Sequence, residues 1–182
     1  MNKPIFNNRE NEEVTLPDGR TKWLSRSAAV VGIILGIVED NIYVLTEKRS
    51  KLMDEPHKWC VICGYLDWDE DGYEGIVRET YEETSFYIPM WENRLCFDND
   101  KQPFYVNTNP RNDEKQNVSL TYVFIYKFNN KLPRSFEMFK CREVDQIKWM
   151  EISEIYQGNK ECAFEHDLRI EMAIQKYKKY LI

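Results

Sequence analysis

The sequence has no apolar segment long enough to cross a membrane. Its most apolar stretch, Ala28–Val38, is about half as long as a membrane span and contains two glycines. Met1–Glu13 is polar and of mixed charge, which is not the pattern of a signal peptide. We therefore expect a cytoplasmic protein with no membrane partner.

The sequence also lacks an excess of positive charge. Lys and Arg number 25 against 31 Asp and Glu, which gives a net charge of -6. This balance argues against a protein that holds DNA or RNA by bulk electrostatic attraction, so we expect no nucleic-acid partner. A small phosphate ligand is still allowed, because one bound metal ion can reverse the sign of the local charge.

Cysteines are few, odd in number and scattered. There are 5, and such a set suits a reducing compartment better than a disulfide framework. Cys60 and Cys63 form a C-x-x-C pair, but no second C-x-x-C and no nearby Cys/His pair completes a tetrahedral site. We expect two small apolar residues on a buried strand, with a redox or zinc role as the weaker alternative.

The bulk composition is that of one globular domain. The chain has 182 residues, of which 42% are hydrophobic, and this is enough to build a core of its own. We expect a flexible N-terminal arm over residues 1–12 and a single domain over residues 13–182.

The hydrophobic pattern predicts an α/β (α+β) fold. Strands are expected over residues 28–38, 42–47, 59–62, 117–128 and 144–150, helices over 73–84, 152–156 and 164–180, and a hairpin over 14–24. The strand over 28–38 is continuous and β-branched, so it should be central and buried on both faces. Strands interleaved with few helices indicate a mixed β-sheet sandwiched between helices. The expected apolar face of the last helix consists of Leu168, Ile170, Met172, Ala173, Ile174, Tyr177 and Tyr180.

The segment from Gly64 to Phe86 carries closely spaced carboxylates on a predicted helix. At about 100° per residue, one arc of that helix, which should pack on the sheet, holds Tyr73, Ile76, Val77, Thr80 and Tyr81. Glu79, Glu82 and Glu83 are spaced i, i+3 and i+4 and should lie on the roughly opposite side. A divalent cation would remove the repulsion among them, and oxygen ligands select Mg²⁺ or Mn²⁺ over Zn²⁺.

This segment resembles the Nudix box. The box reads Gly, five residues, Glu, seven residues, Arg-Glu, an aliphatic residue, any residue, Glu-Glu, any residue, Gly and an aliphatic residue. The matching positions are Gly64, Glu70, Arg78, Glu79, Glu82 and Glu83. Chance would place these six at fixed spacing on the order of once in ten thousand chains, so a merely solvated acidic face is the weaker interpretation.

Two positions depart from the box. Thr80 replaces the aliphatic residue and can still pack. Ser85 replaces the Gly that normally takes a left-handed conformation at the helix end. Ser should cost up to ~1 kcal/mol there, or the turn is built differently.

The resemblance implies a Nudix fold and an enzyme that acts on acid anhydrides. Its reaction would be Mg²⁺-dependent hydrolysis, with Mn²⁺ as substitute, of a pyrophosphate bond in a nucleoside diphosphate linked to another moiety. A nucleotide sugar, an ADP-ribose-like molecule and a nucleoside triphosphate all fit that class. The implied metal ligands are Glu79, Glu82, Glu83 and the backbone carbonyl of Cys63. Glu79 binds metal or helps to deprotonate water, and Arg78 and Glu70 orient the helix carboxylates; from spacing, Arg78 can meet Glu70, Glu74 or Glu82.

Candidates outside the box carry plain alternatives. Asp113 or Glu114 would be a general base, or else each is a solvated loop charge. Lys48 and Arg49 would contact phosphate, or else they are ordinary surface charges. His166 would touch the substrate, or else it caps the last helix.

A second function remains open at the level of sequence. A Nudix-fold module can bind a nucleotide and regulate without cleaving it, although such modules usually lose box carboxylates, and this chain keeps all four box Glu. In either case the partner would be a small-molecule nucleotide. The N-terminal hairpin is a plausible contact element for a homodimer.

Overall fold

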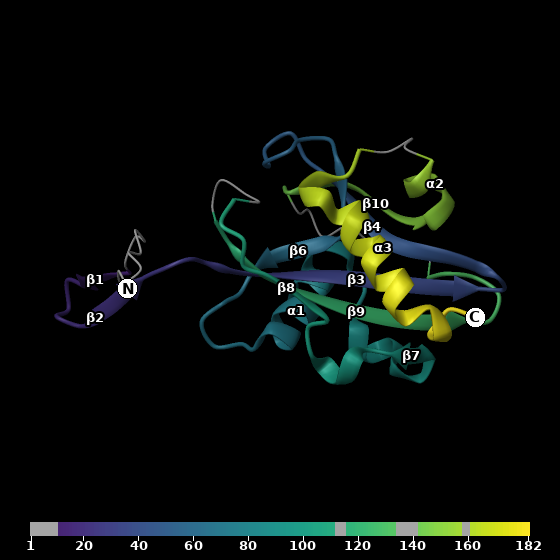
Figure 1. The fold of residues 1–182 in the computed structure, drawn as a ribbon, viewed down its shortest axis with the longest axis horizontal. Coiled ribbons are helices and arrows are strands. Elements are labelled where there is room, and N and C mark those ends of the chain that lie inside the picture. Colours follow the sequence, from purple (N-terminus) through teal and green to yellow (C-terminus); the bar gives the residue numbers. More distant parts are fainter. Residues whose placement is uncertain (1–10, 112–115, 134–141, 158–160) are drawn as a thin grey trace, which may run out of the picture.

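A computed structural model describes residues 11–111, 116–133, 142–157 and 161–182 (Figure 1). Its strands are β1 (Glu12–Thr15), β2 (Thr21–Leu24), β3 (Ala28–Val38), β4 (Asn41–Arg49), β5 (Trp59–Cys60), β6 (Ile62–Tyr65), β7 (Leu95–Phe97), β8 (Tyr105–Asn107), β9 (Val118–Phe128) and β10 (Val144–Glu151). Its α-helices are α1 (Gly72–Thr84), α2 (Ile152–Tyr156) and α3 (His166–Tyr177). Its short 3-10 helices are η1 (Ile88–Arg94), η2 (Asn99–Lys101), η3 (Ala163–Glu165) and η4 (Lys178–Tyr180).

Strand β3 is the centre of a mixed sheet. It pairs in parallel with β9 along its whole length, from Ala28 opposite Val118 to Val38 opposite Phe128. On its other edge it pairs antiparallel with β4 and β6. The order β10-β4-β3-β9-β7 confirms the predicted mixed sheet with the 28–38 segment in the middle.

Alternate residues of β3 enter two separate cores. Val31, Ile33 and the residues that follow at period two join a core beneath α2 and α3. Val30 and Ile34 join the core beneath α1. Figure 1 shows α3 crossing one face of the sheet and α1 covering the other. Because both faces of β3 are covered, its sequence is apolar without alternation, as in strands buried on both sides.

Helix α1 begins and ends with local signals that the sequence contains. Asp71 is the N-cap: its side chain accepts from the backbone N–H of Glu74, whose own carboxylate accepts from the Asp71 N–H. This capping box satisfies two helix-end donors. At the other end Ser85 adopts φ 58° and ψ 11°, so the left-handed turn of the box is kept with Ser in place of Gly.

The two ends of the chain give one confirmation and one correction. Strands β1 and β2 form the predicted hairpin, a separate two-stranded sheet whose Gly19 turns with φ +84°. The predicted face of the last helix is partly wrong, because Leu168 and Met172 are exposed. Its core side consists of Ile170, Ala173 and Tyr177.

No helix among the described residues is both long and apolar enough to cross a membrane.

Candidate active site

Arg78 on α1 gathers three box carboxylates. Its Nε and Nη2 atoms donate to the two oxygens of Glu70 at 3.0 and 2.7 Å. Its Nη1 donates to Glu79 Oε1 at 2.9 Å and to Glu82 Oε2 at 3.0 Å. We call Glu70, Arg78, Glu79 and Glu82 the Arg78 cluster. The predicted alternative that Arg78 meets Glu74 is wrong, because Glu74 is used in the capping box.

The planar guanidinium fixes the orientation of these carboxylates. Two parallel hydrogen bonds from the guanidinium hold the Glu70 carboxylate in one orientation. They lower the pKa of Glu70 below its ordinary value. The opposing carboxylates in turn raise the pKa of Arg78, so it stays charged at any working pH.

Gly64 of the box makes room for Glu79. A Cβ atom at Gly64 would lie 2.1 Å from Glu79 Oε1. The Glu79 carboxylate therefore rests on the backbone of β6, next to Cys63, and its side chain is only 13% exposed. Burial raises the pKa of Glu79, although Arg78 opposes this effect. A carboxyl with a raised pKa in this position suits either metal binding or proton transfer.

Glu83 neighbours Glu79 around the helix but lies deeper in the protein. It is 6% exposed, and its Oε2 atom is buried with no hydrogen-bond partner. It interacts with Glu47 of β4, whose Oε2 atom is buried and unpartnered too. Burial and the neighbouring Glu47 raise the pKa of Glu83 well above its ordinary value, and burial raises that of Glu47 to about 7. Two carboxyl groups this close do not both ionise unless a cation joins them.

The predicted division of α1 into an apolar arc and an acidic arc is wrong at two residues. Glu83 follows Ile76 by seven positions, which places it only ~20° away around the helix, on the core side. Ile76, Thr80 and Glu83 are accordingly buried together. Tyr81, predicted to pack on the sheet, is 42% exposed and contacts the ring of Tyr87.

The basic candidates on β4 lie in different surroundings. Arg49 is buried, so the alternative of an ordinary surface charge is wrong for it. Its Nε donates to the carbonyl of Asp54 at 2.6 Å, and its guanidinium lies over the ring of Phe164. Lys48 is half-buried on the same strand. Both phosphate contacts remain predictions, and Lys48 is the more accessible of the two.

His166 is also inside the protein. It is 2% exposed, and its Nδ1 accepts from the backbone N–H of Val61 at 3.3 Å. The alternative that His166 caps the last helix is wrong, because the N-cap of α3 is Glu165, no side-chain hydrogen bond caps the helix, and the His166 ring faces the β5–β6 loop. A direct contact with substrate needs an accessible ring, so the position of His166 does not support that prediction.

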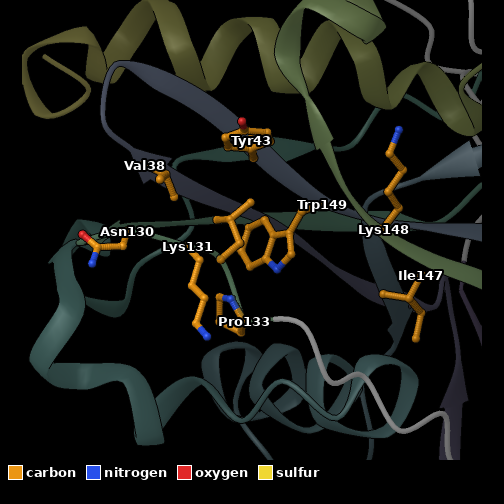
Figure 2. Close-up of a pocket in the computed structure, with 9 residues that line it drawn as sticks. Val38, Tyr43, Asn130, Lys131, Pro133, Ile147, Lys148 and Trp149 are labelled. Atoms are coloured by element: carbon orange, nitrogen blue, oxygen red, sulfur yellow. The ribbon is translucent and has the colours of Figure 1, made fainter.

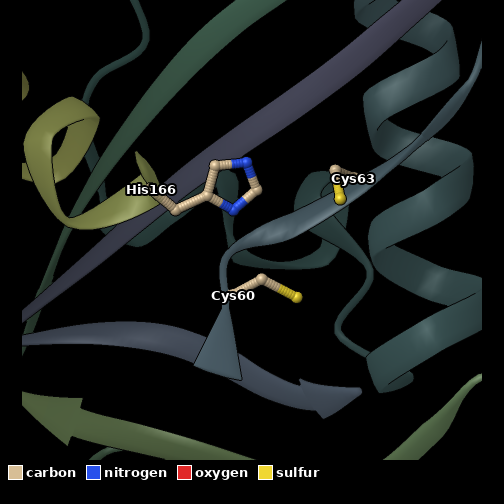
Figure 3. Close-up of side chains that lie close together, drawn as sticks. All are labelled: Cys60, Cys63 and His166. Carbon is tan, nitrogen blue, oxygen red and sulfur yellow. The ribbon is translucent and has the colours of Figure 1, made fainter. Parts of the chain in front are cut away.

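The ring of His166 lies beside the two cysteines of the C-x-x-C pair (Figure 3). We call Glu47, Cys60, Cys63, Glu83 and His166 the inner cluster, since Cys60 Sγ in turn donates to Glu47 Oε1. His166 therefore approaches the pair in space, although it is distant from the pair in sequence. The remaining candidates for a general base, Asp113 and Glu114, lie outside the described residues.

The donor atoms at α1 fit a hard divalent cation. Glu79 and Glu82 present carboxylates on the outer side of the helix, and Glu83 has a buried oxygen without a partner. Mg²⁺ prefers such oxygens together with water and phosphate oxygens. The backbone carbonyl of Cys63 remains a predicted ligand of the same type.

A shallow pocket elsewhere does not share this chemistry. It lies between the ends of β3, β4 and β10 and contains Tyr43, Lys131 and Trp149 (Figure 2). Lys148, which also lines it, is paired with Glu154. No carboxylate of the Nudix box lines this pocket among the described residues.

Comparison with known proteins identifies the family. The profile of the NUDIX domain matches residues 26–169, which include the Arg78 cluster and the inner cluster. The chain belongs to the NUDIX family. No curated protein matches the chain.

Solved structures share the fold at low identity. The NUDIX domain of Shewanella oneidensis NrtR, complexed with ADP ribose, is 18% identical with a TM-score of 0.63 and covers 84% of this chain and 89% of its own. A bifunctional NMN adenylyltransferase/ADP ribose pyrophosphatase from Francisella tularensis is 19% identical (TM-score 0.62; 84% of this chain, 42% of that one). A C. elegans Ap4A hydrolase is 20% identical (TM-score 0.55; 85% and 97%).

Sequence reasoning missed Glu47 altogether. A charged residue that continues an apolar strand run, Val44-Leu-Thr-Glu47, was the signal available. Glu47 lies directly opposite Cys60 across the β4–β5 pair, so the same side of the sheet holds both side chains. A strand carboxylate paired with a buried cysteine marks a polar site within a core.

Proposed function

We propose that this chain is a Mg²⁺-dependent pyrophosphohydrolase. Its substrate would be a nucleoside diphosphate linked to another moiety. The observation that carries the proposal is the Arg78 cluster beside the unpartnered carboxyl oxygen of Glu83, in a chain of the NUDIX family. Proteins of this fold include the NrtR domain complexed with ADP ribose, the bifunctional ADP ribose pyrophosphatase and the Ap4A hydrolase, and ADP ribose and Ap4A both contain pyrophosphate bonds.

The reaction is the addition of water to one phosphorus of the diphosphate. The oxygen of water bonds to that phosphorus, the bridging P–O bond breaks, and the leaving phosphate takes up a proton. Glu79, Glu82 and Glu83, with the Cys63 carbonyl, would hold Mg²⁺, which when bound neutralises phosphate oxygens. Catalysis of this class rests mainly on positioning and electrostatics.

The protein's own groups would divide the remaining work. Arg78 and Glu70 keep Glu79 and Glu82 from rotating away, because both lie on the same guanidinium. Glu79, with its raised pKa, is the box residue best suited to accept the proton of water. Lys48 at the end of β4 offers a positive charge for the far phosphate. Glu114 or Asp113 remains the alternative base.

The test is cleavage of a panel of nucleoside diphosphate derivatives, with Mg²⁺, into a nucleoside monophosphate and a second phosphomonoester. Glu82→Gln and Glu83→Gln keep the side-chain shape and remove the charge. We expect each to lower kcat/KM by roughly 10²- to 10³-fold, as for lost groups that stabilise charge in the transition state. Glu92→Gln, an exposed Glu outside the box, is the matched control and should leave activity unchanged. The proposal would be overturned if activity survived both box changes, or if no substrate of the panel were hydrolysed.

One observation favours a second function. A structure of Shewanella oneidensis NrtR with a 27mer DNA has the same fold, with 17% identity, a TM-score of 0.59 and 62% of that chain covered. A binding module would hold ADP ribose without hydrolysing it. Calorimetry with ADP ribose, run beside the hydrolysis assay, separates the two functions, because only the module gives saturable heat and forms no AMP.

A further inference from the structure

Three ligand-forming side chains meet behind α1 in a group that the Nudix box does not contain. One donor atom from each of Cys60, Cys63 and His166 lies within 4.8 Å of the other two. Cys60 ends β5, Cys63 is in β6 and His166 begins α3, so three elements converge (Figure 3). Ligand atoms in a tetrahedral zinc site with Cys and His are roughly 3.5–3.8 Å apart, which small side-chain rotations here would reach.

Glu47 lies next to this group. It is 1% exposed, and its Oε1 atom accepts from Cys60 Sγ at 3.3 Å. Its carboxylate is not among the donor atoms that lie within 4.8 Å of one another, so its side chain would have to turn to reach a shared metal ion. Its carboxyl also interacts with that of Glu83, so it is not isolated within the protein.

The chemistry of the four side chains selects the metal. Burial and the nearby cations Arg169 and Arg49 lower the pKa of His166, which keeps the imidazole neutral. Neutral imidazole is the form that binds metals, and zinc on Nδ1 would replace the hydrogen bond that this atom accepts from the Val61 N–H. Two cysteines at C-x-x-C spacing, one imidazole and one carboxylate are soft and borderline donors that suit tetrahedral Zn²⁺, whereas Mg²⁺ prefers oxygen alone.

Charge balance also fits a bound cation. Two thiolates and one carboxylate carry three negative charges, and Zn²⁺ leaves a remainder of one. The buried guanidinium of Arg49 interacts with Cys60, Cys63 and Glu47 and supplies the balancing charge. Buried ions are tolerated when they are paired in this way.

We propose that Cys60, Cys63 and His166, with Glu47 beside them, form a structural zinc site behind the Nudix helix. It would use the Cys63 thiolate, whereas the Mg²⁺ site would use the backbone carbonyl of the same residue. Glu47 would have to turn towards the three grouped donor atoms to complete the four positions of a closed structural site. It would tie the start of α3 to the β5–β6 loop and to β4. Binding would release the two thiol protons to solvent.

The first experiment uses the unmutated full chain, purified with reductant. Zinc is counted by plasma mass spectrometry, and Co²⁺ replaces it for absorption spectroscopy. We expect about one zinc per chain and a cobalt spectrum with thiolate charge-transfer bands and intense tetrahedral d–d bands. Excess Mg²⁺ should leave that spectrum unchanged, because Mg²⁺ does not take thiolate ligands.

Variants then assign the ligands. Cys60→Ser and Cys63→Ser should each lose the charge-transfer intensity of one thiolate and weaken cobalt binding at least 10-fold. Cys96→Ser removes an exposed cysteine away from the site and is the matched control, which should keep the full spectrum. Glu82→Gln should keep it too, because Glu82 belongs to the Mg²⁺ site.

Contrary outcomes are equally clear. No zinc together with weak, octahedral cobalt bands in the unmutated chain would overturn the proposal without recourse to any variant. A mass lower by two hydrogens from a Cys60–Cys63 disulfide, with no metal in the reduced chain, would overturn it in favour of a redox pair. An unchanged cobalt spectrum in folded Cys63→Ser would do the same.

Discussion

The carboxylates of the Arg78 cluster and those of the inner cluster have their negative charge compensated in different ways. In the Arg78 cluster, one guanidinium neutralises Glu70, Glu79 and Glu82 and sets their orientation. In the inner cluster, Glu47 and Glu83 have buried oxygens without hydrogen-bond partners, and their pKa values rise. The fold thus supplies the counter-charge on one side and leaves it to protons or metal ions on the other.

This difference explains how one helix can serve two kinds of site. Outer carboxylates that are already oriented can take a hard cation and release it without loss of structure. Inner groups that lack a counter-charge gain most from a cation that stays bound. Substitution of Arg78 tests this comparison most severely, and substitutions around Arg78 test its details.

Among the changes that test this comparison, the largest effect is expected from Arg78→Lys. Lysine keeps the positive charge but cannot hold Glu70 in a two-point hydrogen bond while also contacting Glu79 and Glu82. We expect kcat/KM to fall roughly 10- to 100-fold, as for groups that orient metal ligands. Steady-state hydrolysis at saturating Mg²⁺ measures it. An unchanged rate would show that the carboxylates need no arginine for orientation.

A smaller effect is expected from Gly64→Ala. The added methyl would displace the Glu79 carboxylate, which is the far end of a flexible side chain and can move. Activity should therefore fall about 10-fold while the free energy of unfolding changes by less than ~1 kcal/mol. Kinetics and urea unfolding on the same preparation check the two parts. A large loss of stability with normal activity would mean that Gly64 serves the fold instead.

The end of α1 offers a change in the opposite direction. Ser85 has φ 58°, a left-handed conformation that disfavours residues with a side chain. Ser85→Gly should raise the free energy of unfolding by roughly 0.5–1 kcal/mol, since Gly takes this conformation without steric cost. Chemical denaturation measures it, and activity should stay within about twofold. A loss of stability would show that the Ser85 side chain contributes more than its strain costs.

The smallest effect concerns pH. The folded-state pKa of Glu70 lies below its ordinary value of 4.5, so its pair with Arg78 stabilises the fold above that pH. The stabilisation is lost as the pH falls through the lower folded-state pKa. Glu70→Gln should therefore lower the melting temperature at pH 7 and make little difference once the pH is below the lowered folded-state pKa of Glu70. A difference that stays constant across this range would contradict the ion pair.

Local patterns in the sequence predicted much of the fold and the outer site. Strands β3 and β9 and helix α1 follow from apolar runs and capping residues, and these are properties of neighbouring positions. The sequence also allows the prediction that Glu83 faces the core, because its angular distance from Ile76 around the helix is small. The i, i+3 and i+4 spacing of Glu79, Glu82 and Glu83 had instead predicted that all three lie opposite the core.

The inner cluster could not be predicted in this way. His166 reaches the C-x-x-C pair only because α3 crosses the sheet and begins beside the β5–β6 loop. Glu47 reaches Cys60 through the register of β4 with β5. Both contacts join residues that are distant in sequence, so they depend on the complete topology.

The central claim, hydrolysis of a pyrophosphate bond at the carboxylates of α1, is tested most directly in water enriched in ¹⁸O. ADP-ribose and related diphosphates are incubated with the full chain and Mg²⁺, and the products are examined by mass spectrometry. We predict one ¹⁸O atom in a product phosphate, and a rate that falls roughly 10²- to 10⁴-fold in Glu79→Gln. Products that form at the same rate in Glu79→Gln, or no labelled phosphate from any substrate, would contradict the account.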